Sequence, residues 1–179
     1  IISGYNREYR GWGAEDEAEP RNYYGLTKYK GEIAAAQFCK KLFIVRISWV
    51  FGVYGKNFVA TMLRVGKDRK DLTVVCDQVG SPTYTPDLSR LLADMIVTDK
   101  YGKYHATNEG YTSWYDYACE IFRLASLRDR AYADVKVSPV SSSEYSAKAA
   151  RPANSRMSKE SLDRAGFDRL PTWQDALGR

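Results

Sequence analysis

Several residue types and patterns that mark specialised proteins are scarce or missing in this sequence. It has a single histidine, His105, and no Cys-x-x-Cys pair, which excludes the common zinc-binding patterns. Its three cysteines are far apart and have apolar neighbours, so we expect reduced thiols in the core and no disulfide framework. No apolar run approaches the roughly 20 residues that a membrane-spanning helix needs. These absences indicate a globular protein that does not enter a membrane, and they predict a cytoplasmic location.

A concentration of one charge is also missing. The formal net charge is +5 and the isoelectric point is about 9.0, but the 27 Lys and Arg residues are scattered among 22 Asp and Glu residues. Nucleic-acid binding usually requires basic residues gathered on one face or along one helix, so the charge pattern predicts no nucleic-acid partner. A mild positive excess suits a substrate that carries a diphosphate.

Helical and strand patterns alternate along the chain. Helix formers or cap signals indicate helices at 23–40, 57–65, 85–95, 113–124, 158–165 and from 172 onward, and the strand candidates lie at 42–50, 72–76, 104–106 and 135–140. In the first helix, the spacing of Ala34, Ala35 and Phe38 predicts a buried face. Alternation of this kind predicts an α/β fold in which helical crossovers join parallel strands.

Several helix ends carry capping residues. Thr85 is the expected N-cap of its helix, with Pro86 at the first helical position. Ser113 and Asp116 form a capping-box pattern, and Gly166 is placed to end a short helix. Ser158 and Thr172 are expected to begin the last two helices.

The motif that carries chemistry is Tyr24-Gly25-Leu26-Thr27-Lys28, at the start of the first predicted helix. Residues four apart in a helix project from one face, so the phenol of Tyr24 and the ammonium of Lys28 can act on one substrate. A neighbouring cation favours the deprotonated form of a phenol. Reduction of a ketone by hydride needs such a proton source, since the oxygen gains negative charge as the carbon is reduced. The alternative is a surface Tyr and Lys on a solvated helix.

The wider sequence resembles the dTDP-4-dehydrorhamnose reductases, which are extended short-chain dehydrogenase/reductases. The similar stretches run from Asn22 to Glu32, from Arg46 to Gly52, from Asn57 to Val59, from Val75 to Thr83 and from Arg151 to Ser155. Tyr-x-x-x-Lys is generic to the superfamily, whereas Asp-Gln-x-Gly-x-Pro-Thr and Arg-Pro-x-Asn-Ser are more particular to this reductase group. Members reduce the C4 keto group of a dTDP-4-keto-6-deoxy sugar with NADPH or NADH.

The resemblance implies a role for each matching residue. Tyr24 would protonate the C4 oxygen, and Lys28 would bind the nicotinamide ribose. Ser48 and Trp49 would line the nicotinamide and sugar pocket, with core filling as the alternative for Trp49. Asn57, Gln78 and Arg151 would contact the diphosphate or sugar, the alternatives being a helix cap, a loop hydrogen bond and a surface ion pair. The resemblance leaves a magnesium ion open as a further cofactor.

The expected fold is a partial Rossmann-like α/β domain, a doubly wound parallel sheet, with a small C-terminal α/β substrate-binding lobe. Residues 1–56 would be the remnant of the dinucleotide-binding domain. Residues 57–179 would form the lobe, with some elements returning to the Rossmann sheet. The family's Gly-x-x-Gly-x-x-Gly loop, which binds the pyrophosphate, is absent from the 179 residues.

Two hypotheses follow from this absence and from the opening Ile1-Ile2-Ser3-Gly4, which lacks an initiator Met. The chain would be a fragment, and it would associate, for example as a homo-oligomer, to cover an exposed sheet edge. Ser3 matches the family's Asp position, so it is not the catalytic hydroxyl. Two other functions stay open: an epimerase or dehydratase of the same superfamily, and a non-catalytic reductase-like binding or regulatory subunit.

Overall fold

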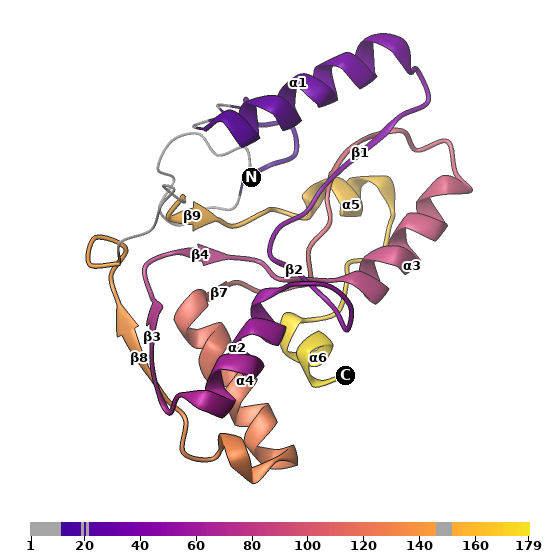
Figure 1. The fold of residues 1–179 in the computed structure, drawn as a ribbon. Helices are drawn as coiled ribbons and strands as arrows, with labels where there is room; N and C mark the ends of the chain where they lie inside the picture. Colours follow the sequence, from indigo (N-terminus) through magenta and orange to yellow (C-terminus); the bar gives the residue numbers. More distant parts are fainter. Residues whose placement is uncertain (1–11, 19, 21, 146–151) are drawn as a thin grey trace.

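The computed structural model describes residues 12–18, 20, 22–145 and 152–179 (Figure 1). Its helices are α1 (Tyr23–Phe38), α2 (Phe58–Asp68), α3 (Thr85–Ile96), α4 (Trp114–Arg128), α5 (Glu160–Ala165) and α6 (Trp173–Gly178), with a 3-10 turn η1 (Arg130–Tyr132). Its strands are β1 (Phe43–Arg46), β2 (Val50–Phe51), β3 (Asp71–Val75), β4 (Val79–Gly80), β5 (Thr83–Tyr84), β6 (Gly102–His105), β7 (Thr112–Ser113), β8 (Lys136–Val140) and β9 (Asn154–Ser155).

Most of the strand pairs are parallel, which confirms the α/β prediction. Parallel pairing joins β1 to β6, β2 to β5, β3 to β8 and β4 to β9, while β4 and β7 pair antiparallel. In the longest ladder β3 and β8 run in register from Asp71 opposite Lys136 to Val75 opposite Val140. Each parallel pair joins strands that are distant in the sequence, as helical crossovers require.

The predicted single strand at 42–50 is wrong in its middle. Strand β1 ends at Arg46, β2 begins at Val50, and Trp49 between them has φ 46°, a left-handed conformation that is uncommon for a residue with a side chain. The Ser48 hydroxyl donates to the Ser81 carbonyl at 2.6 Å, and the Thr83 hydroxyl donates to the Ser48 carbonyl at 2.6 Å. These tertiary hydrogen bonds hold the interruption.

The cap predictions have mixed outcomes. The Ser113 hydroxyl accepts the Asp116 N–H at 3.0 Å, and Gly166 ends α5 with φ 67°, so both predictions are confirmed. Thr172 caps α6 as predicted. Thr85 is not a cap, because it already lies in α3, whose N-cap is Tyr84 without a side-chain hydrogen bond. The N-cap of α5 is Lys159, one residue after Ser158.

Two clusters of buried apolar residues form the core. One lies between α3, β6 and the C-terminal segment and contains Leu91, Met95, Tyr104, Ala106, Leu162, Phe167 and Leu170. The other is rich in aromatic rings and contains Phe51, Tyr117, Ile121, Trp173 and Ala176. No helix within the described part of the chain is long and apolar enough to cross a membrane.

Helix α1 departs from the predicted burial. Phe38 is 86% exposed, and Gly25 is the one buried residue along the whole helix. The predicted face of Ala34, Ala35 and Phe38 is therefore wrong for this chain, because little of the described polypeptide packs against it.

All three cysteines are free, as predicted, but Cys39 is exposed and Cys76 and Cys119 are partly buried, so the expectation of core thiols is wrong.

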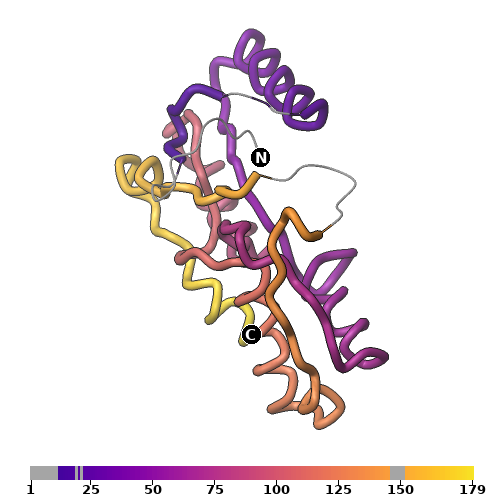
Figure 2. The backbone as a smooth tube through the Cα atoms, turned by 90° about the vertical axis from the view of Figure 1, so that its left-hand side faces the viewer, coloured from indigo at the N-terminus to yellow at the C-terminus, as the bar shows by residue number. Residues whose placement is uncertain are grey.

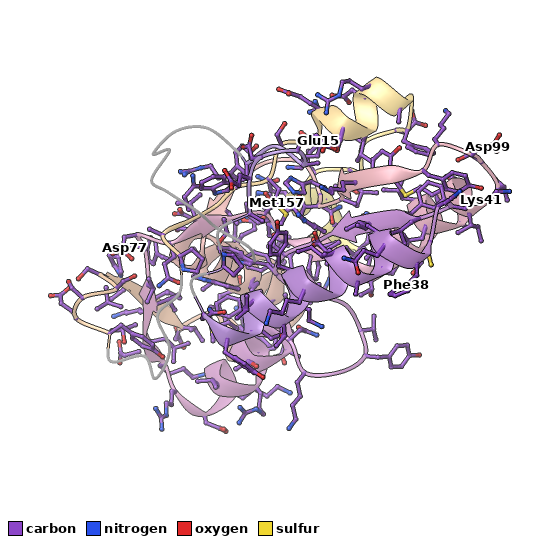
Figure 3. All side chains as sticks on the ribbon, turned by 90° about the horizontal axis from the view of Figure 1, so that it is seen from above. Glu15, Phe38, Lys41, Asp77, Asp99 and Met157 are labelled. Carbon is purple, nitrogen blue, oxygen red and sulfur yellow. The ribbon has the colours of Figure 1, made fainter. Side chains whose placement is uncertain are left out.

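The molecule is elongated, with α1 at one end and the turn between α4 and β8 at the other (Figure 2). Seen from above α1, Asp77 and Asp99 lie toward opposite ends and Met157 lies centrally (Figure 3). Strand β1 returns from the end of α1 and pairs with β6 (Figure 1). The division of the chain at residue 56 stays a prediction.

Candidate active site

Tyr24 and Lys28 lie in the first turns of α1, where local sequence sets the helix start. The side chain of Asn22 is the N-cap and accepts the Gly25 N–H at 2.8 Å. The spacing of four places the two side chains on one face, and the Lys28 ammonium lies 5.4 Å from the centre of the Tyr24 ring. The Tyr24 side chain is 63% exposed. The phenol and the ammonium are thus neighbours that both remain accessible to a bound molecule.

Both side chains line a cavity of about 340 Å³ between α1, the end of β1 and the segment 12–18. Its remaining lining residues are Trp12, Gly13, Asp16, Glu17, Ala18, Glu32, Val45, Arg46, Ile47, His105, Ser155 and Met157. A pocket in which a few charged and polar groups converge between apolar walls is the usual form of a small-molecule site. The Tyr-x-x-x-Lys motif therefore faces a space that a substrate or cofactor can enter.

An ion pair joins two elements that line the cavity, α1 and β1. Arg46, the last residue of β1, donates from Nε and Nη2 to the two carboxylate oxygens of Glu32, at 2.9 and 2.7 Å. Both side chains are mostly buried, with exposures of 13% for Arg46 and 16% for Glu32. A planar guanidinium that grips a carboxylate with two hydrogen bonds fixes orientation as well as distance. This pair links α1 directly to the sheet.

His105 also lies in the cavity wall and is 2% exposed. Burial lowers its pKa to about 4, and the nearby Arg46 charge acts in the same direction. The imidazole is therefore neutral at physiological pH. Its Nδ1 lies 3.0 Å from the carbonyl oxygen of Trp12, so the ring contacts the loop that forms the cavity's other side.

Trp12 anchors that loop through its backbone and its side chain. Its N–H donates to the Arg156 carbonyl at 2.8 Å, and its own carbonyl accepts the Ser158 N–H at 2.8 Å. The indole N–H reaches the Asn154 carbonyl at 3.3 Å. These bonds connect the segment before α1 to β9, so residues 142 positions apart in the sequence meet at one cavity.

Ser48 and Trp49 are not among the residues that line this cavity. The Ser48 hydroxyl is buried and bonded to Ser81, as described for the β1–β2 break. The Trp49 ring stacks on Trp114 with centroids 3.6 Å apart and planes at 14°, and it also covers Gly80, where an added Cβ would come within 2.7 Å of the indole. Trp49 therefore packs within the aromatic cluster, which is the arrangement that the core-filling alternative describes.

The other predicted binding residues are also engaged within the protein. The Asn57 side chain caps α2 by accepting the Ala60 N–H at 2.9 Å, and it donates to the Gly52 carbonyl at 2.9 Å. The Gln78 amide donates to the Ser142 hydroxyl at 2.9 Å, within a loop contact. Arg151 lies outside the described residues. The structure thus brings Tyr24 and Lys28 together, and places Ser48, Trp49, Asn57 and Gln78 in other surroundings.

Several of the residues that line the cavity were not predicted from the sequence. Glu32 follows Lys28 by four positions on the same helical face, and this spacing could have identified it. Trp12 and His105 had no comparable signal, because they reach the cavity only through tertiary contacts.

Comparison with known proteins identifies the family of the chain. The family described as RmlD substrate binding domain matches residues 4–179. The chain belongs to this family. It is 38% identical over 173 residues to dTDP-4-dehydrorhamnose reductase of Escherichia coli K12, covering 94% of this chain and 58% of that protein. The family resemblance inferred from the motifs is confirmed.

Solved structures of dTDP-4-dehydrorhamnose reductases share the fold of this RmlD-family chain. The enzyme of Bacillus anthracis, solved in complex with NADP, has a TM-score of 0.87 and 42% identity, over 93% of this chain and 57% of its own. The Clostridium acetobutylicum protein has a TM-score of 0.89 and 38% identity, over 96% and 59%. The chain thus spans less than two thirds of the length of these relatives, and the partial Rossmann-like fold is confirmed.

The described residues contain no group of three or more His, Cys, Asp or Glu side chains placed to hold a metal ion. The magnesium ion that the resemblance left open stays a prediction.

Proposed function

We propose that the protein to which this chain belongs reduces the C4 keto group of a dTDP-4-keto-6-deoxy sugar, with NADPH or NADH as reductant. The observation that carries the proposal is the pairing of Tyr24 with Lys28 at an open cavity, at 5.4 Å between ammonium and ring. Relatives of 38% and 42% identity are named dTDP-4-dehydrorhamnose reductases, and one of them was solved with NADP. This supports the reaction and the nicotinamide.

The residues present fit such a cofactor. Lys28 is exposed at the cavity and has three N–H donors for sugar hydroxyls, while the face of Tyr24 is open. The bound nicotinamide would supply a hydride to the carbonyl carbon. Tyr24 would donate its hydroxyl proton to the carbonyl oxygen as that oxygen gains charge. Lys28 would hold the ribose and stabilise the phenolate that proton transfer leaves behind.

The roles implied for Ser48, Trp49, Asn57, Gln78 and Arg151 stay predictions. Four of these side chains bond or stack with other protein groups in the structure.

Replacement of the proposed proton donor tests the function. In the protein expressed from its whole open reading frame, Tyr24→Phe should lower kcat by about 10²–10⁴-fold with little change in substrate affinity, because it removes the transferable proton and almost no surface. Consumption of NADPH or NADH with the dTDP-4-keto-6-deoxy sugar measures turnover, and calorimetry measures affinity.

Tyr23→Phe is the matched control, since Tyr23 is adjacent, 81% exposed and not part of the cavity wall. It should retain full turnover. Near-normal turnover of Tyr24→Phe would remove Tyr24 from the reaction. Binding of the nucleotide sugar without any turnover by the unaltered protein would favour a non-catalytic subunit, and turnover without net oxidation of the nicotinamide would favour an epimerase or dehydratase.

A further inference from the structure

We infer that Glu32, through its ion pair with Arg46, is a positioning residue that sets the rotation of α1 and thereby the placement of Tyr24 and Lys28 over the cavity. This inference rests on the proposed function, because it concerns the geometry of the same reaction. Glu32 and Arg46 act through the other two residues and not on the substrate.

The first observation is that little of the described chain packs on α1. The helix is 16 residues long, yet Gly25 is its one buried residue, and its large apolar side chains Tyr23, Ile33 and Phe38 are 81%, 42% and 86% exposed. Helices in proteins are usually held by burial of an apolar face. Among the described residues, the Glu32–Arg46 pair joins α1 to the sheet by two side-chain hydrogen bonds, so it contributes directly to the rotation of α1 about its own axis.

The second observation is the position of Glu32 on the helix. Tyr24, Lys28 and Glu32 are spaced by four residues, so they form one stripe about 12 Å long, and all three line the cavity. Figure 1 shows that the chain turns from the end of α1 into β1. Arg46, the last residue of β1, donates to Glu32. A fixed contact at Glu32 therefore determines which way the stripe faces along its whole length.

The third observation is that the geometry of the ion pair restrains rotation of α1. Two hydrogen bonds of 2.9 and 2.7 Å join the planar guanidinium to both carboxylate oxygens, and both side chains are at least four fifths buried. Partial burial reduces the screening that makes exposed ion pairs weak. Arg46 is itself held in the sheet, where it pairs in register with the buried His105. The carboxylate is thus attached to a rigid element.

The consequence for catalysis follows from helix geometry. The tip of a tyrosine lies several ångströms outside the Cα radius of about 2.3 Å, so a rotation of α1 by about 10° moves the phenol oxygen by about 1 Å. A misplacement of that size can cost on the order of 100-fold in rate. Loss of the ion pair should therefore slow the reaction without removing any group that takes part in it.

The test uses Glu32→Gln in the protein expressed from its whole open reading frame. We expect kcat to fall by about 100-fold with KM changed by less than about threefold, while the variant remains folded by circular dichroism. Amide hydrogen exchange in residues 23–28 should become faster, which reports the loosened helix without reference to activity. Glu32→Asp, which keeps the charge, should recover part of the loss and decides the question if Glu32→Gln does not fold.

The matched control is Glu120→Gln. Glu120 also accepts two hydrogen bonds from one arginine, Arg123, both at 2.7 Å, but this pair lies on α4 and not at the cavity. Its kcat should equal that of the unaltered protein. A double-mutant cycle with Arg46→Gln should give losses that do not add, because the two residues act as one unit.

The possible outcomes separate this inference from the proposed function. If Glu32→Gln keeps its kcat and its exchange rates while Tyr24→Phe is inactive, the positioning role is overturned and the function stands. A Glu32→Gln variant whose melting temperature falls but whose folded fraction keeps full kcat shows a purely structural ion pair, and this also overturns the inference. If Tyr24→Phe is as active as the unaltered protein, both claims fail.

Discussion

Helices α1 and α4 are nearly equal in length, at 16 and 15 residues, but they are held in different ways. Both begin with a side-chain cap, from Asn22 in α1 and from Ser113 in α4. Helix α4 buries four residues, Tyr117, Ala118, Ile121 and Phe122, within or beside the aromatic cluster. Helix α1 buries only Gly25 and is tied to the sheet by the pair Glu32–Arg46.

Within this chain, the helix that is buried in the core and the helix that carries the candidate catalytic residues are therefore different helices. The candidate catalytic residues lie on the helix that contributes little to the core, at one end of the molecule, while α4 lies toward the other (Figure 2). Sites that bind ligands are often drawn from the less stable parts of a protein. Substitutions in α4 should therefore change the free energy of unfolding, and substitutions in α1 should mainly change turnover.

The largest effect on stability should come from Tyr117. Its side chain is fully buried and contacts the rings of Phe51, Phe58 and Trp173. Tyr117→Ala should lower the free energy of unfolding by about 3–5 kcal/mol, because it removes a large buried ring and leaves a cavity. Urea denaturation measures the change. Tyr117→Phe is the control and should stay within about 1 kcal/mol, since its hydroxyl has no hydrogen-bond partner among the described residues.

The next largest effect on the free energy of unfolding should come from a change of pH, through the titration of His105 in the cavity wall. Burial holds the pKa of His105 at about 4, below its usual 6.5, so between these values the unfolded chain binds a proton that the folded protein does not. The contribution of the neutral imidazole is complete above pH 6.5 and is lost as pH falls toward 4, by up to about 3 kcal/mol. Chemical denaturation at pH 7 and pH 5 should show this slope. A His105→Gln variant with an unchanged slope would contradict the assignment.

The smallest effect should come from the two caps. Asn22→Ala and Ser113→Ala each remove one side-chain acceptor from a helix N-terminus, a loss worth about 1 kcal/mol. We expect Ser113→Ala to lower global stability, whereas Asn22→Ala should mainly speed amide exchange in the first turn of α1, because that helix carries little of the core. Equal losses of global stability would show that α1 is as firmly attached as α4.

Local signals in the sequence were sufficient for the helices and for strands β1, β3, β6 and β8, but they did not predict the two-residue strands β2, β4, β5, β7 and β9. The start of α1, the Ser113 N-cap and the Gly166 stop depend on residues within one turn of each other, and all three are confirmed, while α1 ends at Phe38, two residues before the predicted end at Lys40. The break between β1 and β2 was not predicted, because the hydrogen bonds that hold it join Ser48 to residues 33 and 35 positions away: Ser48 donates to the Ser81 carbonyl and accepts from the Thr83 hydroxyl. The burial of Phe38 was wrong because periodicity predicts which residues share a face but not what covers that face.

The candidate site also has one part that local sequence predicts and another that depends on tertiary contacts. Tyr24 and Lys28 were found from their spacing, since four residues of helix bring two side chains together in any helix. The rest of the cavity is assembled from segments distant in sequence, with Trp12 bonded to residues near 156 and Arg46 reaching across from β1. Ser48 and Trp49 are not among the residues that line this cavity, and their expected roles in a nicotinamide and sugar pocket stay predictions.

What the sequence determined by itself is the order of the helices and of the four longer strands, the family and the proximity of one phenol to one ammonium. These follow from local periodicity, capping and short motifs, whose physical basis lies within a few residues of chain. Only the tertiary structure decided that this pair faces an open cavity, that His105 is buried and neutral in its wall, and that Glu32 holds α1 to the sheet. Such features depend on contacts between residues far apart in sequence, which local patterns do not encode.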